Sequence, residues 1–166
     1  MKKSILSILT TGFAFLLFCL AAACSSDDNK ADAKPYIDLT AESLEFSVEK
    51  IEDFFGNVTI TGTIKNIGED YQSSEGKQTV RLVERSATGQ VTTLVEQKFV
   101  NLAAGETIVL EYVVQGWRSS EEFPPGFQLG IYYEPDIYID GNPNNDDANP
   151  KNDFLEKKGT EINKLF

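Results

Sequence analysis

The sequence predicts an all-β fold, an antiparallel β-sandwich of about seven strands. Apolar and polar residues alternate with a period of two over most of residues 36–166, and no segment repeats apolar residues at helical spacing. Turns rich in Gly and Asn separate these runs at short intervals. Because one face of each such strand is apolar, two sheets have to stack to bury those faces.

The alternating runs define the expected strands in chain order. In VTITGTIKNIG, Val58, Ile60 and Ile64 alternate with threonines before a turn. The segment SATGQ, residues 86–90, has turn composition and lies between two runs, and Gly159 interrupts the last run. The expected strands cover residues 44–48, 58–64, 79–84, 91–100, 106–115, 127–133 and part of 154–165.

The first residues have the layout of a secretory signal peptide. Two lysines precede an apolar stretch over residues 5–20, and three alanines follow it. A transmembrane helix is the alternative, but it needs about 20 predominantly apolar residues. Polar or small residues interrupt this stretch at Ser7, Thr10, Thr11 and Gly12. The prediction is a signal peptide over residues 1–23.

The segment Leu20-Ala21-Ala22-Ala23-Cys24 resembles the cleavage box of bacterial lipoproteins. The resemblance implies that the Cys24 thiol receives a diacylglycerol, that the chain is cut before it, and that the new N-terminus is acylated, for example with palmitate. Cys19 lies in the discarded segment, so the mature chain would keep a single cysteine and no internal disulfide. Two or more acyl chains would anchor the protein stably to a membrane.

Residues 24–35 are expected to form a flexible, lipidated tether, because they contain few large apolar side chains. Ser25 after the cysteine is compatible with the outer membrane, and Asp27-Asp28 resembles an export tag for surface display. A solvated spacer is the alternative for this acidic pair. The expected location is therefore the bacterial cell envelope, with the protein lipid-anchored at the outer membrane and residues 36–166 forming one β-sandwich domain.

Composition restricts the function classes. Removing residues 1–23 removes two of the 15 basic residues and none of the 26 acidic ones, which leaves a net charge of −13. Such a surface repels nucleic acid. The chain has no histidine, which excludes Ser-His-Asp and Cys-His catalysis and histidine-ligated metal sites. We expect no enzyme, although a hydrolase that uses two carboxylates remains open.

Three segments resemble the cell-adhesion-related domain found in bacteria, an immunoglobulin-like sandwich. They are residues 58–68 with Asn66-x-Gly68, residues 102–106 leading into the next strand, and the strand opening at Gly126 before an Asn/Asp-rich segment. In that family glutamates precede a paired asparagine; here Asn152-Asp153 stands in that place, without a loop glutamate. The resemblance implies an immunoglobulin-like fold, an adhesive or scaffolding role and no catalytic residues.

The segment EPDIYIDGNPNNDDANPKND, residues 134–153, has the composition of a calcium site. From Asp136 to Asp153 it holds five Asp and five Asn against one Lys, and Ca²⁺ takes six to eight oxygen ligands. The spacing does not match an EF-hand, because Asn145 replaces the glycine and Lys151 the glutamate. A polar loop with Asn and Asp in turns is the alternative. The candidate calcium ligands are Asp136, Asp140, Asn142, Asn144, Asp146 and Asp147.

Aromatic residues offer a second candidate site. Trp117 lies in a loop-like segment. Together with Tyr132, Tyr133 and Tyr138 it could form a patch that stacks on sugars or binds a protein. Core packing is the alternative, and alternation places Tyr132 and Tyr133 on opposite faces of their strand. The pair Phe54-Phe55 is expected to plug one end of the sandwich, and an exposed contact on a loop is the alternative.

These observations lead to a ranked set of functions. The first is a non-catalytic envelope lipoprotein, attached to the membrane by its lipid, whose domain serves adhesion, binding or scaffolding of an unknown protein or glycan. The second is a carbohydrate-binding accessory lipoprotein of a glycan-uptake system, which requires a flat row of exposed aromatics. The third is a carboxylate hydrolase, which requires two acids roughly 5–10 Å apart in one cleft.

Overall fold

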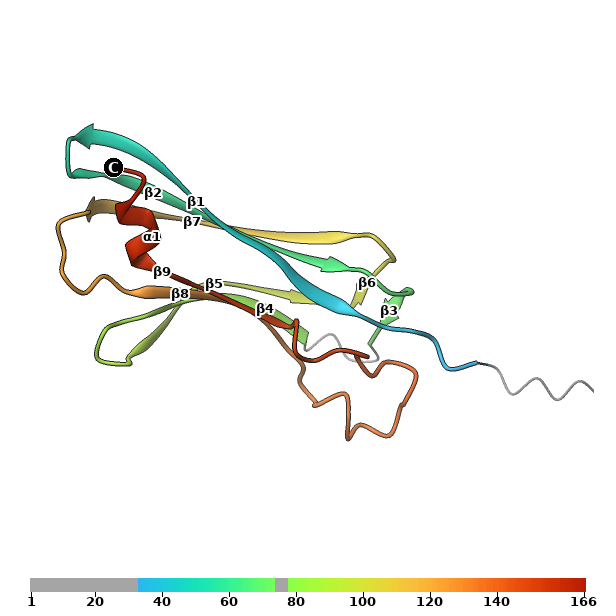
Figure 1. The fold of residues 1–166 in the computed structure, drawn as a ribbon. Coiled ribbons are helices and arrows are strands. Elements are labelled where there is room, and N and C mark those ends of the chain that lie inside the picture. Colours follow the sequence, from blue (N-terminus) through green and yellow to red (C-terminus); the bar gives the residue numbers. More distant parts are fainter. Residues whose placement is uncertain (1–32, 74–77) are drawn as a thin grey trace, which may run out of the picture. The chain divides into compact units, whose positions relative to one another are not determined.

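Two antiparallel sheets stack face to face in the computed structural model of the chain, which describes residues 33–73 and 78–166 (Figure 1). The predicted all-β sandwich is therefore confirmed. Residues 34–166 make up one compact unit. The predicted signal peptide, the predicted lipidation site Cys24 and the predicted tether as far as residue 32 lie outside the described residues.

The first sheet has the strand order β1-β2-β7, with β1 at Leu39–Glu52, β2 at Phe55–Asn66 and β7 at Thr107–Arg118. The central strand β2 alternates half-buried and buried residues along its whole length. Gly62 within it faces Leu129 of the other sheet, where an added Cβ would lie 2.7 Å from the leucine Cδ1 atom. Alternating Val, Ile and Thr is the composition expected of a half-buried strand.

The second sheet has the order β5-β4-β8-β9, with β4 at Gln78–Arg85, β5 at Val91–Phe99, β8 at Gly126–Tyr132 and β9 at Phe154–Lys158. Two very short strands, β3 and β6, pair with each other, so the seven longer strands correspond to the seven predicted. The chain leaves the first sheet after β2 and returns to it at β7, an exchange typical of immunoglobulin-like sandwiches. The two short strands are β3 at Tyr71–Gln72 and β6 at Asn101–Leu102.

The last strand falls within residues 154–165 as predicted, and a short helix that the sequence did not indicate follows it. β9 ends at Lys158, and the short helix α1, Gly159–Asn163, follows. Gly159 marks the change because a Cβ there would collide with the main-chain oxygen of Pro125. The helix packs Ile162, which is fully buried, against the sandwich. Five residues are too few to show a helical period in the sequence.

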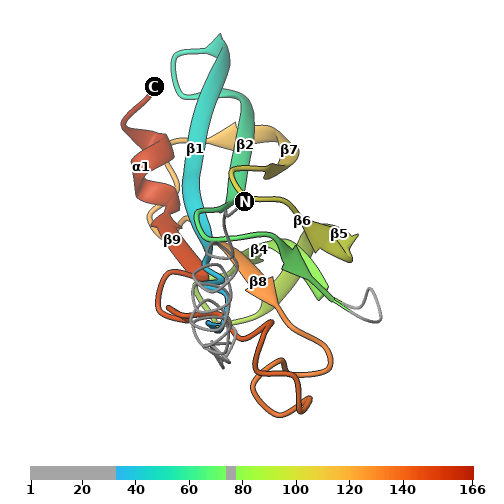
Figure 2. The same ribbon diagram turned by 90° about the vertical axis from the view of Figure 1, so that its right-hand side faces the viewer.

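The core lies between the two sheets and receives apolar side chains from both. On one side of the sandwich β1 lies next to β9, and on the other side β5 lies next to β7 (Figure 2). Phe46, half-buried on β1, contacts Phe127 on β8 with ring centroids 5.7 Å apart. Other buried core residues are Leu44, Val58, Ile60, Ile64, Val80, Leu82, Leu110, Leu129 and Ile131.

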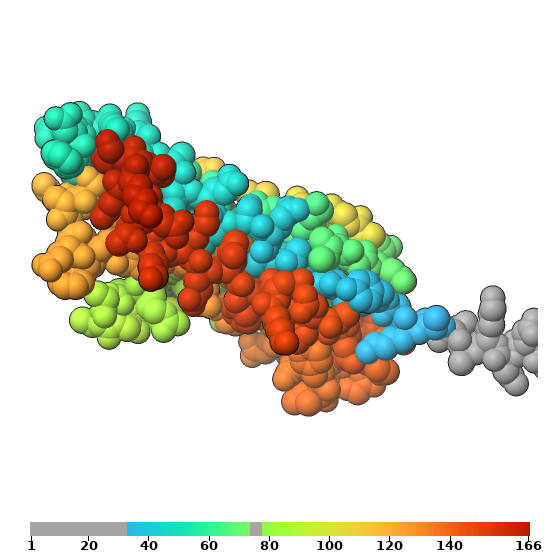
Figure 3. All heavy atoms as spheres, in the orientation of Figure 1, coloured from blue at the N-terminus to red at the C-terminus, as the bar shows by residue number. Residues whose placement is uncertain are grey.

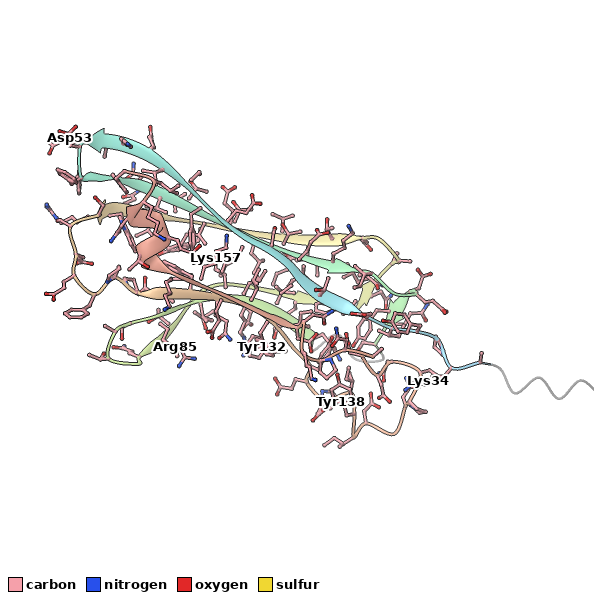
Figure 4. The ribbon with its side chains drawn as sticks, viewed as in Figure 1. Lys34, Asp53, Arg85, Tyr132, Tyr138 and Lys157 are labelled. Atoms are coloured by element: carbon pink, nitrogen blue, oxygen red, sulfur yellow. The ribbon has the colours of Figure 1, made fainter. Side chains whose placement is uncertain are left out.

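The sandwich has two opposite ends along the strand direction. We call residues 34–38, 66–70, 103–106 and 133–153 the N-terminal end. We call the far end the three turns around residues 52–55, 86–90 and 119–125 together with the C-terminus. β1 has 14 residues and runs about 46 Å between the two ends. Lys34 and Tyr138 lie at one end and Asp53 at the other (Figure 4).

Candidate functional site

The Asp/Asn-rich loop packs against the first residues of the domain at the N-terminal end (Figure 3). Ile37 forms an isolated parallel bridge with Asp147, and the Ala148 N–H donates to the Ile37 carbonyl at 2.7 Å. Farther on, the Ala41 N–H donates to the Asn152 carbonyl at 2.8 Å. These main-chain bonds join residues more than 100 positions apart and fix the loop to the start of β1.

The six residues predicted to bind calcium form turns and one ion pair. Asp140 accepts from the Asn142 N–H at 2.7 Å, and Asn142 in turn accepts from the Asn144 N–H at 3.2 Å through its side-chain oxygen. Asp136 likewise accepts from a main-chain N–H two residues later. Asp146 pairs with Lys34 at 2.9 Å. These contacts match the turn chemistry that was the alternative explanation, and the six-residue calcium site stays a prediction.

Three aspartates at this end are almost completely buried. Asp38, Asp147 and Asp153 expose 3%, 4% and 4% of their surface. The two Asp38 oxygens accept from the Tyr36 hydroxyl at 2.7 Å and from the Asn152 side-chain amide at 2.9 Å. Within residues 33–73 and 78–166, no lysine or arginine forms an ion pair with any of the three. Among the described residues, the cluster therefore gathers negative charge without a cationic side chain.

Asp147 is the best hydrogen-bonded of the three. One of its oxygens accepts from the Asn149 N–H at 2.7 Å, and the other accepts from the Leu39 N–H at 2.8 Å and the Tyr133 hydroxyl at 3.1 Å. Burial nevertheless raises the pKa of Asp147 above its ordinary value, although the donors oppose the shift. Burial raises the pKa of Tyr133 strongly, so this phenol stays a proton donor to Asp147.

Asp153 is the aspartate whose loss of hydration is least compensated by hydrogen bonds. Its Oδ1 atom is inaccessible to solvent and has no hydrogen-bond donor. Burial raises the pKa of Asp153 to about 7, with further contributions from the negative charges of Asp147 and Asp38. A buried carboxylate without donors costs several kcal/mol if it stays ionised and unpaired. Asp153 therefore needs either a proton or a cation.

Two amide oxygens near these aspartates in the fold also lack donors. Asn152 Nδ2 is bound to Asp38, and Asn145 Nδ2 is bound to Asp140 at 2.8 Å. Both Oδ1 atoms are buried without a hydrogen bond. Asn145 itself is only 3% exposed. Buried acceptors are normally paired, so Asn145, Asn152 and Asp153 are three residues that bring unsatisfied oxygens to one end of the molecule.

Trp117 belongs to the core. This position corrects the prediction that Trp117 is a binding residue. The side chain is 6% exposed, and its ring centroid lies 6.1 Å from that of Phe127. Its indole N–H donates to Asn163 Oδ1 on α1 at 2.9 Å. A ring enclosed in this way has no open face on which a sugar could stack. Core packing, the alternative reading of the sequence, explains its position.

The far end exposes large apolar side chains. Ile51, Phe54 and Phe123 are 57%, 66% and 71% exposed. The prediction that Phe54 plugs the sandwich is therefore wrong, whereas Phe55 is half-buried with the Arg118 guanidinium 5.1 Å from its ring centroid. Two shallow depressions of about 420 Å³ lie beside Phe54. Their walls come from Lys50, Ile51, Glu52, Asp53, Phe55, Arg118, Ser120 and Phe166.

A third depression, of about 320 Å³, opens beside β8 and β9. Its walls combine three basic with two acidic side chains, so they form no field of one sign: Arg85, Lys157 and Lys158 with Glu156 and Glu161 (Figure 4). On the same sheet Tyr132 and Phe154 meet edge to face, with centroids 5.4 Å apart and ring planes at 83°. This geometry offers no flat aromatic platform.

The comparisons with known proteins assign no family to this chain. No family model matches the chain, and a search of curated proteins finds none with significant similarity. Within the described residues, no helix has the length and apolar character needed to cross a membrane. The resemblance to the bacterial cell-adhesion-related domain stays a prediction.

Sequence reasoning missed most of the buried polar cluster. Asp38 lies in PYIDLT at the start of the domain, and nothing in its local spacing marks it as a partner of a loop 100 residues later. Asn145 was identified only as a departure from the EF-hand. Asn152-Asp153 did carry a signal, because this pair occupies the position of a paired asparagine in the family that the chain resembles. Of the predicted ligands, Asp147 alone belongs to the buried group.

Proposed function

We propose that this chain is a lipid-anchored protein of the bacterial cell envelope whose sandwich is a non-catalytic binding domain, with the far end as its contact surface. The observation that carries the proposal is the exposure of Ile51, Phe54 and Phe123 at the end opposite Lys34 (Figure 4). A lipid on Cys24 would hold the N-terminal end toward the membrane. The far end would then be directed away from it.

The chemistry of the far end favours a protein partner. Exposed aromatic side chains are frequent anchors of protein interfaces, and they bury large apolar areas when a partner covers them. Phe54 and Phe123 come from two turns that a hydrogen bond joins, since the Ser119 N–H donates to the Phe54 carbonyl at 3.0 Å. Acidic and basic groups border it, among them Glu52, Asp53 and Arg118. An apolar centre with a charged rim is the usual composition of a protein interface.

The other two functions have less support. A sugar-binding row would need coplanar exposed rings, whereas Trp117 is buried and Tyr132 meets Phe154 edge to face. A hydrolase would need acids open to substrate. The closely grouped aspartates of the N-terminal end are each at least 96% buried, since their exposure is 3–4%. A substrate could reach them only after the loop had opened.

The membrane part of the proposal is tested with the full-length chain in its native cell. Cys24→Ser removes the thiol that would be acylated. The expected result is that the wild type fractionates with membranes while the variant is released after the same extraction. Metabolic labelling with a fatty acid should mark only the wild type. A wild-type chain that carries no lipid would contradict the anchor.

The binding part is tested by site-specific photo-crosslinking on intact cells. A photoreactive residue at position 54 probes the far end, and one at Glu45, an exposed position in the middle of β1, serves as the matched control. The proposal expects one protein to crosslink from position 54 and not from position 45, and Phe123→Ser to weaken that product. Equal labelling at both positions, or a product that is glycan rather than protein, would contradict it.

A further inference from the structure

We propose that the N-terminal end holds one calcium ion, bound by carboxylate oxygens of Asp153 and Asp147 and by amide oxygens of Asn145 and Asn152, with Asp38 positioning the Asn152 amide. The inference is independent of the far-end contact surface. It differs from the six-residue site predicted in the loop, with which it shares only Asp147. We call these five residues the aspartate cluster.

The first step of the argument concerns charge. Three aspartates with exposures of 3–4% lie near one another, and no described lysine or arginine pairs with them. Like charges that are buried together repel, and each also loses its hydration. Asp38 and Asp147 recover part of this cost through donors, whereas Asp153 has none at Oδ1. A cation is the group that would offset the remaining charge.

The second step concerns the unsatisfied oxygens. Asp153 Oδ1, Asn145 Oδ1 and Asn152 Oδ1 are all buried acceptors without a donor. A proton on Asp153 would satisfy one carboxyl group but would leave the two amide oxygens unpaired. A metal ion accounts for acceptors of both kinds. This is the observation that favours an ion over a simple buried carboxylic acid.

The third step identifies the ion. Every candidate ligand is a carboxylate or amide oxygen, and hard cations such as Ca²⁺ and Mg²⁺ prefer such donors. Calcium accepts mixed sets of Asp, Asn and carbonyl oxygens in flexible geometry, whereas magnesium retains several waters and requires a near-ideal octahedron. A cluster closed to solvent offers little room for retained waters. Calcium therefore fits this site better than magnesium.

Amide ligands are an essential part of the proposed site. No three acidic side chains among residues 33–73 and 78–166 stand close enough to hold a metal ion by themselves. The ion would therefore need the oxygens of Asn145 and Asn152 beside the carboxylates. Asp38 has a positioning role in this arrangement, because it binds Asn152 Nδ2 and thereby fixes the direction of the amide.

The position of the cluster gives the ion a structural task. Asp38 precedes β1, Asp147 belongs to the loop, and Asp153 immediately precedes β9. The Ile131 N–H of β8 donates to the Asp153 carbonyl at 3.0 Å, so the last of these positions is also fixed to the second sheet. One ion at this place would join the first strand, the loop and the second sheet. It would stabilise the end from which the membrane tether leaves.

The experiment measures thermal unfolding of the full-length chain in detergent, first with EDTA and then with CaCl₂ or MgCl₂. The proposal expects CaCl₂ at about 100 times the dissociation constant to raise Tm by about 5–10 °C. MgCl₂ at the same concentration should raise it by less than half as much. Titration calorimetry with CaCl₂ should give one ion per chain. An unchanged Tm in CaCl₂ would overturn the proposal.

Two aspartate-to-asparagine variants locate the ion. Asp153→Asn removes the carboxylate whose Oδ1 atom has no donor. It should fold, because it also removes a buried charge, and it should lose the calcium-induced rise in Tm. Asp136→Asn is the matched control in the predicted loop site, where asparagine can still accept from the Tyr138 N–H. It should keep the full rise. A calcium response that survives Asp153→Asn, or disappears in Asp136→Asn, would overturn the assignment to the aspartate cluster.

Discussion

The two ends of this sandwich differ most in the side chains that they enclose. The N-terminal end encloses three aspartates, although it also exposes Ile139, whereas the far end exposes Ile51, Phe54 and Phe123. At the N-terminal end the chain start, the loop and the strand turns are joined by main-chain and side-chain hydrogen bonds. At the far end, the turns that carry Phe54 and Phe123 project apolar rings.

This difference shows that burial in a β-sandwich does not simply follow hydrophobicity. Polar groups can be enclosed where other polar groups bind them, and apolar groups can stay open where a partner is to cover them. The comparison assigns separate tasks to the two ends: structural integrity to the N-terminal end and contact to the far end. Substitutions at matched positions in the two ends can therefore test this division of tasks.

The largest expected difference in stability between the two ends comes from replacing one glycine with alanine at either end. In Gly68→Ala the new Cβ would lie 2.5 Å from the Asp38 nitrogen and from the Tyr36 oxygen, so the main chain has to move. We expect a loss of about 3 kcal/mol or more in the free energy of unfolding. Gly89→Ala, in the far-end turn, meets no atom within 4 Å and pays only for its φ of +87°, about 1 kcal/mol. Urea unfolding measures both.

A second matched pair compares two asparagines. Asn66 is fully buried; its amide donates to the Glu69 and Leu102 carbonyls, and its oxygen accepts from the Gly68 N–H. Asn66→Ala should cost about 2–3 kcal/mol, because it leaves buried groups unpaired. Asn57→Ala, on β2 two residues beyond a far-end turn, breaks only long hydrogen bonds of 3.3 and 3.5 Å and should cost below about 1 kcal/mol. Chemical unfolding measures both variants, and equal losses in the free energy of unfolding would contradict the difference between the two ends.

A pH titration of stability tests the buried charge. The pKa of Asp153 is raised from 3.8 to about 7 in the folded chain, so between these values the folded state binds more protons than the unfolded state. The contribution of Asp153 to stability is therefore full below pH 4 and is lost as the pH rises through 7. In EDTA, the free energy of unfolding should fall by on the order of 2 kcal/mol from pH 5 to pH 8.

Asp153→Asn is the control for this titration, since it removes the titrating group. The difference between the two proteins should grow with pH, with the variant relatively more stable at pH 8. Parallel pH profiles would show that Asp153 has an ordinary pKa in the folded chain. Other acidic groups contribute to both profiles alike, so the difference isolates the buried carboxyl.

The smallest expected effect on stability is at the far end. Phe54→Ser removes a ring that is 66% exposed, so the free energy of unfolding should change by less than about 0.5 kcal/mol. Contact with the crosslinked protein should nevertheless be lost. Leu44→Ala, a buried substitution in β1, gives the reverse pattern and should cost about 2–5 kcal/mol. A large loss of stability in Phe54→Ser would show that the ring is part of the fold rather than of an interface.

The strands could be predicted from sequence because their signal is local. β2 places Val58, Ile60 and Ile64 on one face with threonines between them, and a period of two requires no knowledge of distant residues. The seven longer strands appear where the alternation placed them. Helix α1 was missed because five residues do not form a repeat.

The buried polar cluster could not be predicted, because its partners are distant in sequence. Asp38 meets Asn152 across more than 100 residues, and composition alone emphasised the exposed aspartates of the loop instead. The loop's own residues mostly satisfy each other in turns, as Asp140 and Asn142 do. Phe54 was misjudged for a different reason: an apolar pair beside a turn is usually buried, and only the fold reveals that one member points outward.

Hydrogen exchange of the full-length chain with and without CaCl₂ tests the separate tasks of the two ends most directly. The main-chain N–H groups of Leu39, Ala41 and Ala148 are bound at the N-terminal end, and that of Ser119 at the far end. Calcium should slow exchange of the first three at least tenfold and leave Ser119 unchanged. Equal slowing at both ends, or no slowing at Leu39, would contradict the account.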